Sequence, residues 1–216
     1  MDSVSGIGVL DKVARILDVL ESDGASTLGE LVDSTDIPRA TLHRLAVAME
    51  QHGMLRRDGD GRFRLGGRFV ALGRAAGAGY PFVEAARPIL DRLRSTTGES
   101  VQLYVREGAS RRCVVSFESP HGLRWIVPEG ALLPLSAGSA GHILSGDKVG
   151  RVGWLQSVGE REAGVASVSA PVRDADGEVV AAISVSGPIE RLTTKPGPRF
   201  GADLVKAAGR IERLLA

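Results

Sequence analysis

The sequence lacks features that define several large classes of proteins. It contains a single cysteine, Cys113, which excludes an internal disulfide framework and a cysteine-rich zinc cluster. No apolar run reaches the roughly 18 residues that a membrane span requires. Residues 1–20 have an early acid and helically spaced apolar residues, instead of the basic flank and continuous apolar core of a signal peptide. We therefore expect a cytoplasmic protein with no membrane partner.

Net charge is also small, but the charged residues are unevenly distributed. The formal net charge of +1 argues against a strongly basic nucleic-acid protein. From Asp2 to Asp36, however, eight acidic residues stand against two basic ones, and from Ile37 to Arg74 eight arginines stand against three acids. A local positive region attracts phosphate even when the whole chain is nearly neutral. The 43% hydrophobic and 25% charged composition is that of a globular protein.

The first part of the chain is predicted to contain three helices. Apolar residues at helical spacing indicate a helix over residues 8–21. Thr27 and Glu30 have the spacing of a capping box, which begins a second, short helix. Pro38 suits the first position of a third helix, because a proline there loses no hydrogen bond. The expected buried stripe of this third helix consists of Leu42, Leu45 and Met49.

A β-hairpin is predicted directly after the third helix, in "MLRRDGDGRFRLG". The "DGDG" segment supplies residues that tolerate a tight turn, and Leu55, Phe63 and Leu65 are expected to point inward. Three helices followed by a hairpin make a winged helix-turn-helix over residues 1–66. The Gly-, Ala- and Arg-rich residues 67–80 are predicted to form a linker helix.

The exposed face of the third helix has a composition that suits the DNA major groove. No acid occurs between Asp36 and Glu50. Arginine can bind guanine through two hydrogen bonds, and threonine and alanine can contact the thymine methyl group. The candidate DNA-binding residues on this helix are Arg39, Ala40, Thr41, His43 and Arg44. The alternative is an ordinary solvated amphipathic helix.

Arginines of the hairpin are candidates for contacts to phosphate or to the minor groove. They are Arg57, Arg62 and Arg64. We expect Arg44 to contribute sequence specificity and Arg62 to contribute affinity for any sequence. The alternative for each hairpin arginine is a charge that only keeps the hairpin soluble.

The second part of the chain is predicted to be an α+β domain with an antiparallel sheet. An amphipathic helix with Phe82 and Leu93 on its apolar face ends at "TTG". Strand-like segments follow at "SVQLYVRE", "RRCVVSFES" and "LRWIVPEG", and two more strands are joined at "DADG". A last helix is expected to pack an apolar face that runs from Phe200 to Leu214. Strands grouped between flanking helices favour this fold class.

The motifs "VLDKVARILDVL", "LGELVDSTDIPRATLHRLAVAMEQHGML" and "GRFRLG" resemble the IclR family of bacterial transcriptional regulators. The similarity continues through "GALLPLSAGSAGHIL" and "GVASVSAPVRDADGEVVAAISVSGP", so it covers nearly the whole chain. The resemblance implies a homodimer, often assembling further to a tetramer, that binds a near-palindromic operator in double-stranded DNA. Residues 81–216 would then form a GAF-like effector-binding and oligomerisation domain.

The resemblance also places an effector pocket between the segment after "LPL" and the last two strands. Its residues here would be Ser139, Ala140, Ser157, Ser167, Ser184 and Ser186. Serine hydroxyls and backbone N–H groups make a neutral cradle for a small carboxylate or another polar metabolite. Family members often carry an acid and a cysteine at the positions of Ser157 and Ser167. Some members of the family bind a metal, but because of these two differences we do not expect this protein to do so. We expect no cofactor either.

Two further features of the sequence compare this chain with particular members of the family. The link at residues 145–153 is shorter than the helical segment that most members have there. Either this chain has lost the segment, or residues of the natural protein are missing from the sequence, and an intact-mass measurement distinguishes the two. The segments "GIGVLDKVARIL", "TGESVQLY" and "SGPIERLT" resemble an actinobacterial subgroup associated with amino-acid metabolism, including leucine biosynthesis.

Two other functions compete with an effector-responsive regulator. In the first, the protein binds DNA but its C-terminal domain only dimerises. In the second, the protein is a small-molecule hydrolase with a serine nucleophile paired to His121 or His142. The hydrolase is disfavoured because "AGSAG" around Ser139 lacks the first glycine of a nucleophile elbow. Cys113 is expected to be a buried packing residue and not a redox sensor.

Overall fold

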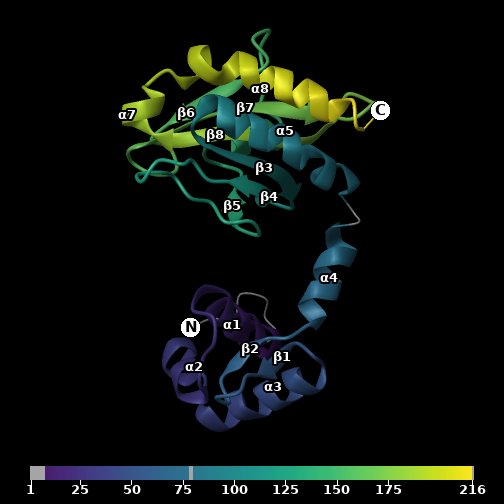
Figure 1. Ribbon diagram of the computed structural model, residues 1–216, viewed down its shortest axis with the longest axis vertical. Coiled ribbons are helices and arrows are strands. Elements are labelled where there is room, and N and C mark those ends of the chain that lie inside the picture. The colour runs from purple at the N-terminus through teal and green to yellow at the C-terminus, as the bar shows by residue number, and fades with distance from the viewer. Residues whose placement is uncertain (1–7, 78–79, 216) are drawn as a thin grey trace. The chain divides into compact units, whose positions relative to one another are not determined.

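A computed structural model describes residues 8–77 and 80–215 of the chain. The chain divides into two compact units, residues 1–80 and residues 81–216, each with its own core (Figure 1). Each expected domain or linker range includes a few residues outside the described part: 1–7 in the first domain, 78–79 in the linker and 216 in the last domain.

The first unit begins with three helices around a small apolar core. They are α1 (Gly8–Ser22), α2 (Leu28–Thr35) and α3 (Arg39–Gln51). The predicted capping box is confirmed: Thr27 Oγ1 accepts from the backbone N–H of Glu30, and Glu30 accepts from the N–H of Thr27. Pro38 is the N-cap of α3 and not its first residue, because its ψ of 132° is extended. The core consists of Ile16, Leu20, Leu31, Ile37, Leu42, Ala46, Met49, Leu55 and Phe63.

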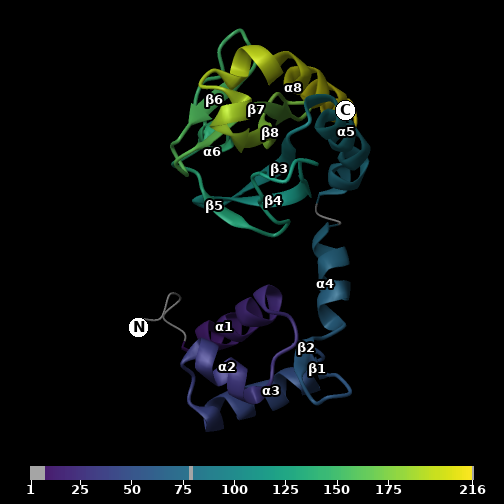
Figure 2. The same ribbon diagram turned by 60° about the vertical axis from the view of Figure 1, so that its left-hand side comes forward.

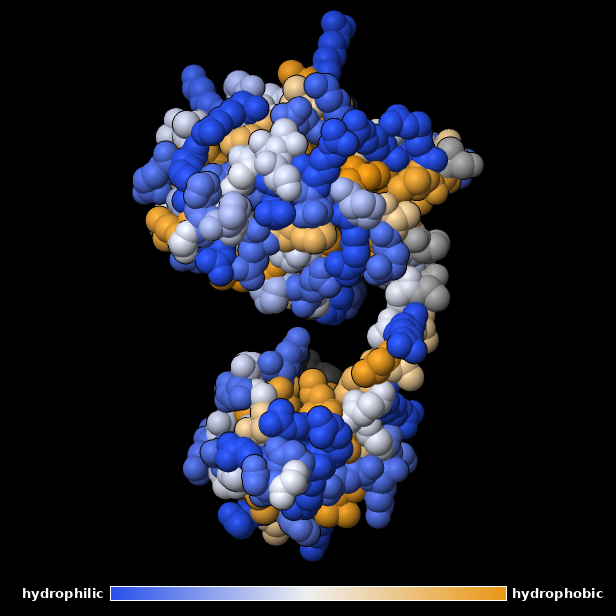
Figure 3. All heavy atoms as spheres, viewed as in Figure 1, coloured by the Kyte–Doolittle hydropathy of each residue, from blue (hydrophilic) through white to orange (hydrophobic). Residues whose placement is uncertain are grey.

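The predicted hairpin is also present. Strands β1 (Leu55–Arg57) and β2 (Phe63–Leu65) pair antiparallel. Leu55 and Phe63 are buried, but the expectation that Leu65 also packs inward is wrong, because the core cluster ends at Phe63 and leaves Leu65 36% exposed. Helix α4 (Arg68–Gly77) follows and has no buried residue. Its exposed apolar side chains include Val70 and Leu72, and Figure 3 shows hydrophobic residues on its surface.

The second unit contains an antiparallel sheet, as the sequence predicts, and this sheet has six strands. Its strands lie in the order β5-β4-β3-β8-β7-β6. Their bounds are β3 Ser100–Glu107, β4 Ser110–Phe117, β5 Leu132–Pro134, β6 Leu155–Val158, β7 Val165–Arg173 and β8 Val179–Pro188. The long pairing of β7 with β8 confirms the two strands predicted on either side of "DADG".

Helices cover both faces of this sheet. Helices α5 (Pro81–Thr97) and α8 (Pro196–Glu212) pack on one face, and the short α6 (Ser139–Ser145) packs on the other (Figure 2). A single turn, α7 (Ile189–Leu192), follows β8. The face under α5 and α8 is apolar, with Val101, Leu103, Val168, Ala170, Ile183 and Val185 among its buried residues.

Three sequence expectations for the second unit need correction. The segment "LRWIVPEG" is not a strand, because only its end reaches β4: Gly130 N donates to Cys113 O, and Cys113 N donates to Ala131 O. The rest is loop, in which Leu123 and Ile126 are exposed. Leu214 does not pack with the last helix, which ends at Glu212, and it is 49% exposed. Helix α6, strand β6 and the turn α7 were not expected from periodicity, because elements of four to seven residues are too short to give a clear periodic pattern.

Within residues 8–77 and 80–215, no helix is both long and apolar enough to cross a bilayer. The same residues contain no group of three or more histidine, cysteine or carboxylate side chains that could hold a metal ion.

Helix α8 provides a test of the core of the second unit. An added Cβ at Gly201 would overlap the indole of Trp154, which packs against the core. We expect Gly201→Ala to lower the free energy of unfolding by about 1–3 kcal/mol. The matched control is Gly209→Ala on the same helix, where the nearest atom to an added Cβ is 3.9 Å away. It should be neutral or stabilising by up to about 1 kcal/mol, because alanine is the better helix former. Tryptophan fluorescence during urea unfolding measures both, because Trp125 and Trp154 lie in this unit.

The thiol of Cys113 provides a second test. Burial raises the pKa of Cys113 to about 12, and the residue has no exposed surface. We expect the thiol of the folded protein to resist an aromatic disulfide reagent at about pH 8, and to react fully after denaturation, since only the thiolate attacks. Rapid reaction of the native protein would show that this side of the sheet opens, contrary to the packing described here.

Candidate functional site

The exposed face of α3 is set up by the turn that precedes it. Asp36 adopts a left-handed conformation, with a φ of 54°, and caps α2 by donating its backbone N–H to Val32 O. Ile37 is buried and anchors the turn. The helix then buries Leu42, Ala46 and Met49 on one side. Four of the five candidate residues on α3 are exposed on the other side, Arg39, Ala40, His43 and Arg44, and Thr41 is half-buried.

This face carries unneutralised positive charge. Among the described residues, no carboxylate forms an ion pair with Arg39 or Arg44. The first turn of α3 contains no acid, so the positive end of the helix dipole is not screened from within the helix. A helix end of this kind, with exposed arginines beside it, is suited to bind a polyanion.

The three candidate arginines of the hairpin are arranged differently, because each is already paired with a carboxylate. Arg57 pairs with Glu50 at 3.2 Å and lies over the ring of Phe63. Arg64 pairs with Asp58 at 2.9 Å, and this hydrogen bond is the main cause that lowers the pKa of Asp58. Pairs as exposed as these contribute little to stability and exchange partners readily.

Arg62 has a more structural position than the other two. Its guanidinium pairs with Glu30 at 2.7 Å and also donates to the backbone oxygen of Ala25. Glu30 is the capping-box residue of α2, and its pKa is lowered first by the backbone N–H of Thr27 and then by Arg62. Arg62 therefore joins the hairpin to the start of α2, through an ion pair as exposed as those of Arg57 and Arg64.

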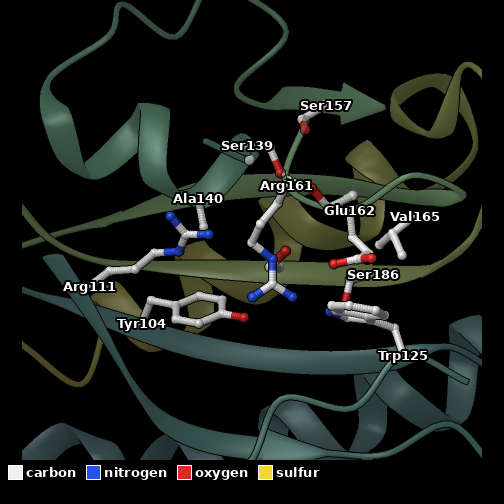
Figure 4. Close-up of a pocket in the computed structure, with 13 residues that line it drawn as sticks. Tyr104, Arg111, Trp125, Ser139, Ala140, Ser157, Arg161, Glu162, Val165 and Ser186 are labelled. Carbon is white, nitrogen blue, oxygen red and sulfur yellow. Dashed lines mark hydrogen bonds between the residues drawn. The ribbon is translucent and has the colours of Figure 1, made fainter. Parts of the chain in front are cut away.

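A small cavity, with a volume of about 30 Å³, lies on the α6 side of the sheet (Figure 4). All six residues expected to form the effector pocket line it, and the structure thus brings them together from α6, β6, β7 and β8. The sequence did not predict the other lining residues, which are Tyr104, Arg111, Trp125, Gly138, Arg161, Glu162 and Val165.

The serines form the polar back of the cavity. Ser139 Oγ lies 2.8 Å from Ser167 Oγ and 2.7 Å from Ser169 Oγ. Ser186 Oγ donates to Oε1 of Gln102, which is fully buried beneath it on β3. The side-chain nitrogen of Gln102 has no hydrogen-bond partner. These hydroxyls are therefore held in fixed positions, as a preorganised binding surface requires.

Arg111 contributes a buried positive charge to the cavity wall. It is 3% exposed, it donates to the backbone oxygens of Pro134 and Ala137, and its guanidinium lies over the ring of Tyr104. Among the residues that the structure describes, none is a hydrogen-bond partner of its Nε. Burial lowers the pKa of Arg111 and raises that of the Tyr104 hydroxyl. A signal for Arg111 was present in the sequence, because it lies two residues before the buried Cys113 on the same strand and therefore on the same face.

Arg161 enters the cavity from the loop between β6 and β7. Its guanidinium lies over the indole of Trp125, 4.7 Å from the ring centroid. The preceding residue, Glu160, accepts from Gly138 N at 3.0 Å and binds His142 Nε2 at 2.8 Å. Burial raises the pKa of Glu160, but these hydrogen bonds outweigh burial and hold it below its ordinary value.

The same contacts argue against a hydrolase. His142 binds Asp147 and Glu160, whereas Ser139 binds only other serines. Within the described residues, neither His142 nor His121 is hydrogen-bonded to a serine side chain that could act as a nucleophile.

Comparison with known proteins agrees with both halves of this arrangement. Residues 9–59 match the IclR helix-turn-helix domain. Residues 78–148 and 146–213 match the C-terminal domain of bacterial IclR transcriptional regulators. The second match is in two pieces that overlap at residues 146–148, inside the short link at residues 145–153.

Curated relatives and solved structures extend the similarity over the whole chain. The chain is 26% identical to the transcriptional repressor IclR of Escherichia coli, covering 89% of this chain and 84% of the relative. It is 31% identical to a putative IclR-family regulator from Rhodococcus sp., with a TM-score of 0.57 over 99% of this chain and 96% of that one. An IclR homologue from Microbacterium hydrocarbonoxydans, solved with 4-hydroxybenzoate, is 24% identical and has a TM-score of 0.78, covering 96% of this chain and 98% of that one.

These relatives are transcriptional regulators and not enzymes. The two matched domains, the exposed α3 of the first unit and the GAF-like sheet of the second lead to one conclusion: the chain belongs to the IclR family of DNA-binding transcriptional regulators.

Proposed function

We propose that this protein is a sequence-specific regulator whose affinity for its operator is set by a small metabolite bound in the cavity of the second unit. Residues 1–66 bind DNA, residues 67–80 connect, and residues 81–216 bind the effector and assemble the oligomer. The observation that carries this proposal is the cavity itself, because a domain that served only for dimerisation has no need of fixed hydroxyls and a buried arginine around an open space.

DNA recognition is assigned to α3 and the hairpin. Arg44 and His43 face the base edges from the middle of the exposed face, Ala40 and Thr41 contact thymine methyl groups, and Arg39 binds a phosphate at the helix start. Arg57 and Arg64 contact phosphate by exchanging their weak surface ion pairs. Arg62 acts indirectly, by fixing the hairpin on α2.

The operator is double-stranded DNA with near-palindromic half-sites, bound in the cytoplasm by a homodimer that assembles further to a tetramer. A two-fold dimer presents two equivalent α3 helices, so the site it reads has matching symmetry. Family membership supports this assembly.

The effector is a small polar metabolite or small carboxylate. Ser139, Ala140, Ser157, Ser167, Ser184 and Ser186 would contact it. The complex of the Microbacterium homologue with 4-hydroxybenzoate supports this class of ligand. The regulated genes belong to amino-acid metabolism, including leucine biosynthesis, a pathway supported by the three sequence segments that resemble that subgroup. Genome-wide recovery of bound DNA fragments tests it.

A DNA-binding experiment tests the role of α3. A cognate duplex is first selected from a random library with the full-length protein. Arg44→Ala should then weaken binding to this duplex by about 10- to 100-fold, because a bidentate contact to guanine contributes about 1–3 kcal/mol, and should weaken binding to random DNA much less. The control is Arg74→Ala, an exposed arginine of α4, which should leave both affinities nearly unchanged. Equal losses of Arg44→Ala on cognate and random DNA would refute base readout by this residue.

A ligand experiment separates effector sensing from simple dimerisation. Amino acids and small organic acids, including 4-hydroxybenzoate, are screened for an increase in melting temperature that grows with concentration. A ligand at 100 times its Kd should stabilise the native protein by about 2.7 kcal/mol and should also change its operator affinity. If no compound shifts melting and none alters operator binding, the alternative in which the second unit only dimerises is favoured.

A further inference from the structure

The guanidinium of Arg161 points into the cavity, and the residue as a whole is half-buried. Figure 4 shows its side chain descending from the loop between β6 and β7, with the guanidinium between Trp125 and Tyr104. It lies over the indole of Trp125, and the hydroxyl of Tyr104 points toward it. Arginine side chains usually extend into solvent, so contacts with the rest of the protein are needed to keep this one pointing into the cavity.

The loop that carries Arg161 is fixed on the side of α6. Glu160 accepts from the backbone N–H of Gly138 and binds His142, and Gly138 itself lines the cavity. The residue next to these two hydrogen bonds is Arg161. These two hydrogen bonds hold Glu160 beside α6, and they therefore limit where the guanidinium of the next residue, Arg161, can lie.

Within the cavity the guanidinium has no anionic partner. Among the described residues, Arg161 forms no ion pair, and its assigned contact is the indole face of Trp125. Stacking uses the flat face of the guanidinium and leaves its N–H groups free at the edge. An edge of this kind binds a carboxylate through two parallel hydrogen bonds. A carboxylate of the ligand can thus pair with the edge of the Arg161 guanidinium while the face of the guanidinium remains stacked on Trp125.

The charged residues of the cavity lining indicate the net charge of the ligand. The lining contains two arginines, Arg111 and Arg161, and one carboxylate, Glu162, which is exposed. Arg111 is almost fully buried and has an Nε without a partner. One added negative charge neutralises this set, whereas a zwitterion leaves it positive. A net anion is therefore the better complement.

We propose that Arg161 is the residue that selects the effector, and that the effector is a small monocarboxylate without an ammonium group, whose carboxylate pairs with Arg161 edge to edge. This assignment rests on the proposed function of the cavity and specifies its ligand. The serines of β7 and β8 then contact the polar part of the ligand body, and the aromatic faces of Tyr104 and Trp125 bound the remainder of the space.

Calorimetry with matched pairs of ligands tests the proposal on the full-length protein. The probes are 4-hydroxybenzoate against 4-hydroxybenzamide, and 4-methyl-2-oxopentanoate against leucine. At least one acid should bind, with an affinity at least about tenfold higher than its neutral or zwitterionic counterpart. Arg161→Gln should remove this preference by raising the Kd of the acid about tenfold or more, and Arg161→Lys should restore part of it. Arg151→Gln, at an exposed arginine outside the cavity, should retain it.

Three outcomes overturn the assignment: neither acid binds, amide or leucine binds as tightly as the acid, or Arg161→Gln keeps the preference of the natural protein. Tryptophan fluorescence establishes that each variant is folded. Operator binding without ligand is measured on the same samples. A protein that still binds its selected duplex, and that still responds to a neutral metabolite, refutes the role of Arg161 but keeps the proposed regulator. If the natural protein shows no specific DNA binding, the proposal that it is a regulator is refuted.

Discussion

The second unit depends on the strict alternation of side chains along its two longest strands. On β7, Ala166, Val168 and Ala170 point toward α5 and α8, whereas Ser167 and Ser169 point to the other face. On β8, Ile183 and Val185 join the first set, and Ser184 and Ser186 join the second. Because successive residues of a strand face opposite sides, one sequence supplies an apolar core and a polar cavity wall together. A shift of register by one residue would exchange the two.

Small side chains on the cavity face are what keep the space open. Serine and alanine are short, so α6 can approach the sheet closely at Ser139 while a hollow remains beside it. The serines bind one another or buried polar groups, so their hydroxyls are not orphaned when the cavity is empty. The larger and charged groups of the lining come from elsewhere: Tyr104 from β3, Arg111 from β4, Trp125 from the loop after β4, and Arg161 from the loop after β6. Helix α6 and strands β6, β7 and β8 thus supply the small polar side chains, whereas β3, β4 and two loops supply the aromatic rings and the arginines.

This division also explains how much the sequence predicted. Capping, turn and alternation patterns are local, and they correctly predicted the three N-terminal helices, the hairpin and the β7–β8 pair. Resemblance supplied six cavity positions on α6 and the strands, and the structure brings them together. Arg161 and Trp125 were not found as a pair, because they lie in loops and meet only through tertiary packing. The ion pair of Arg62 with Glu30 was missed for the same reason, because the two residues are far apart in sequence.

That last pair has a mechanical consequence. A single carboxylate, Glu30, holds the N-terminal end of α2 through Thr27 and holds the hairpin through Arg62. Ser26 adds a backbone bridge to Phe63 on the same side. These contacts connect the start of α2 with strand β2, so loss of the Glu30 carboxylate would disturb the helix cap and the hairpin attachment together.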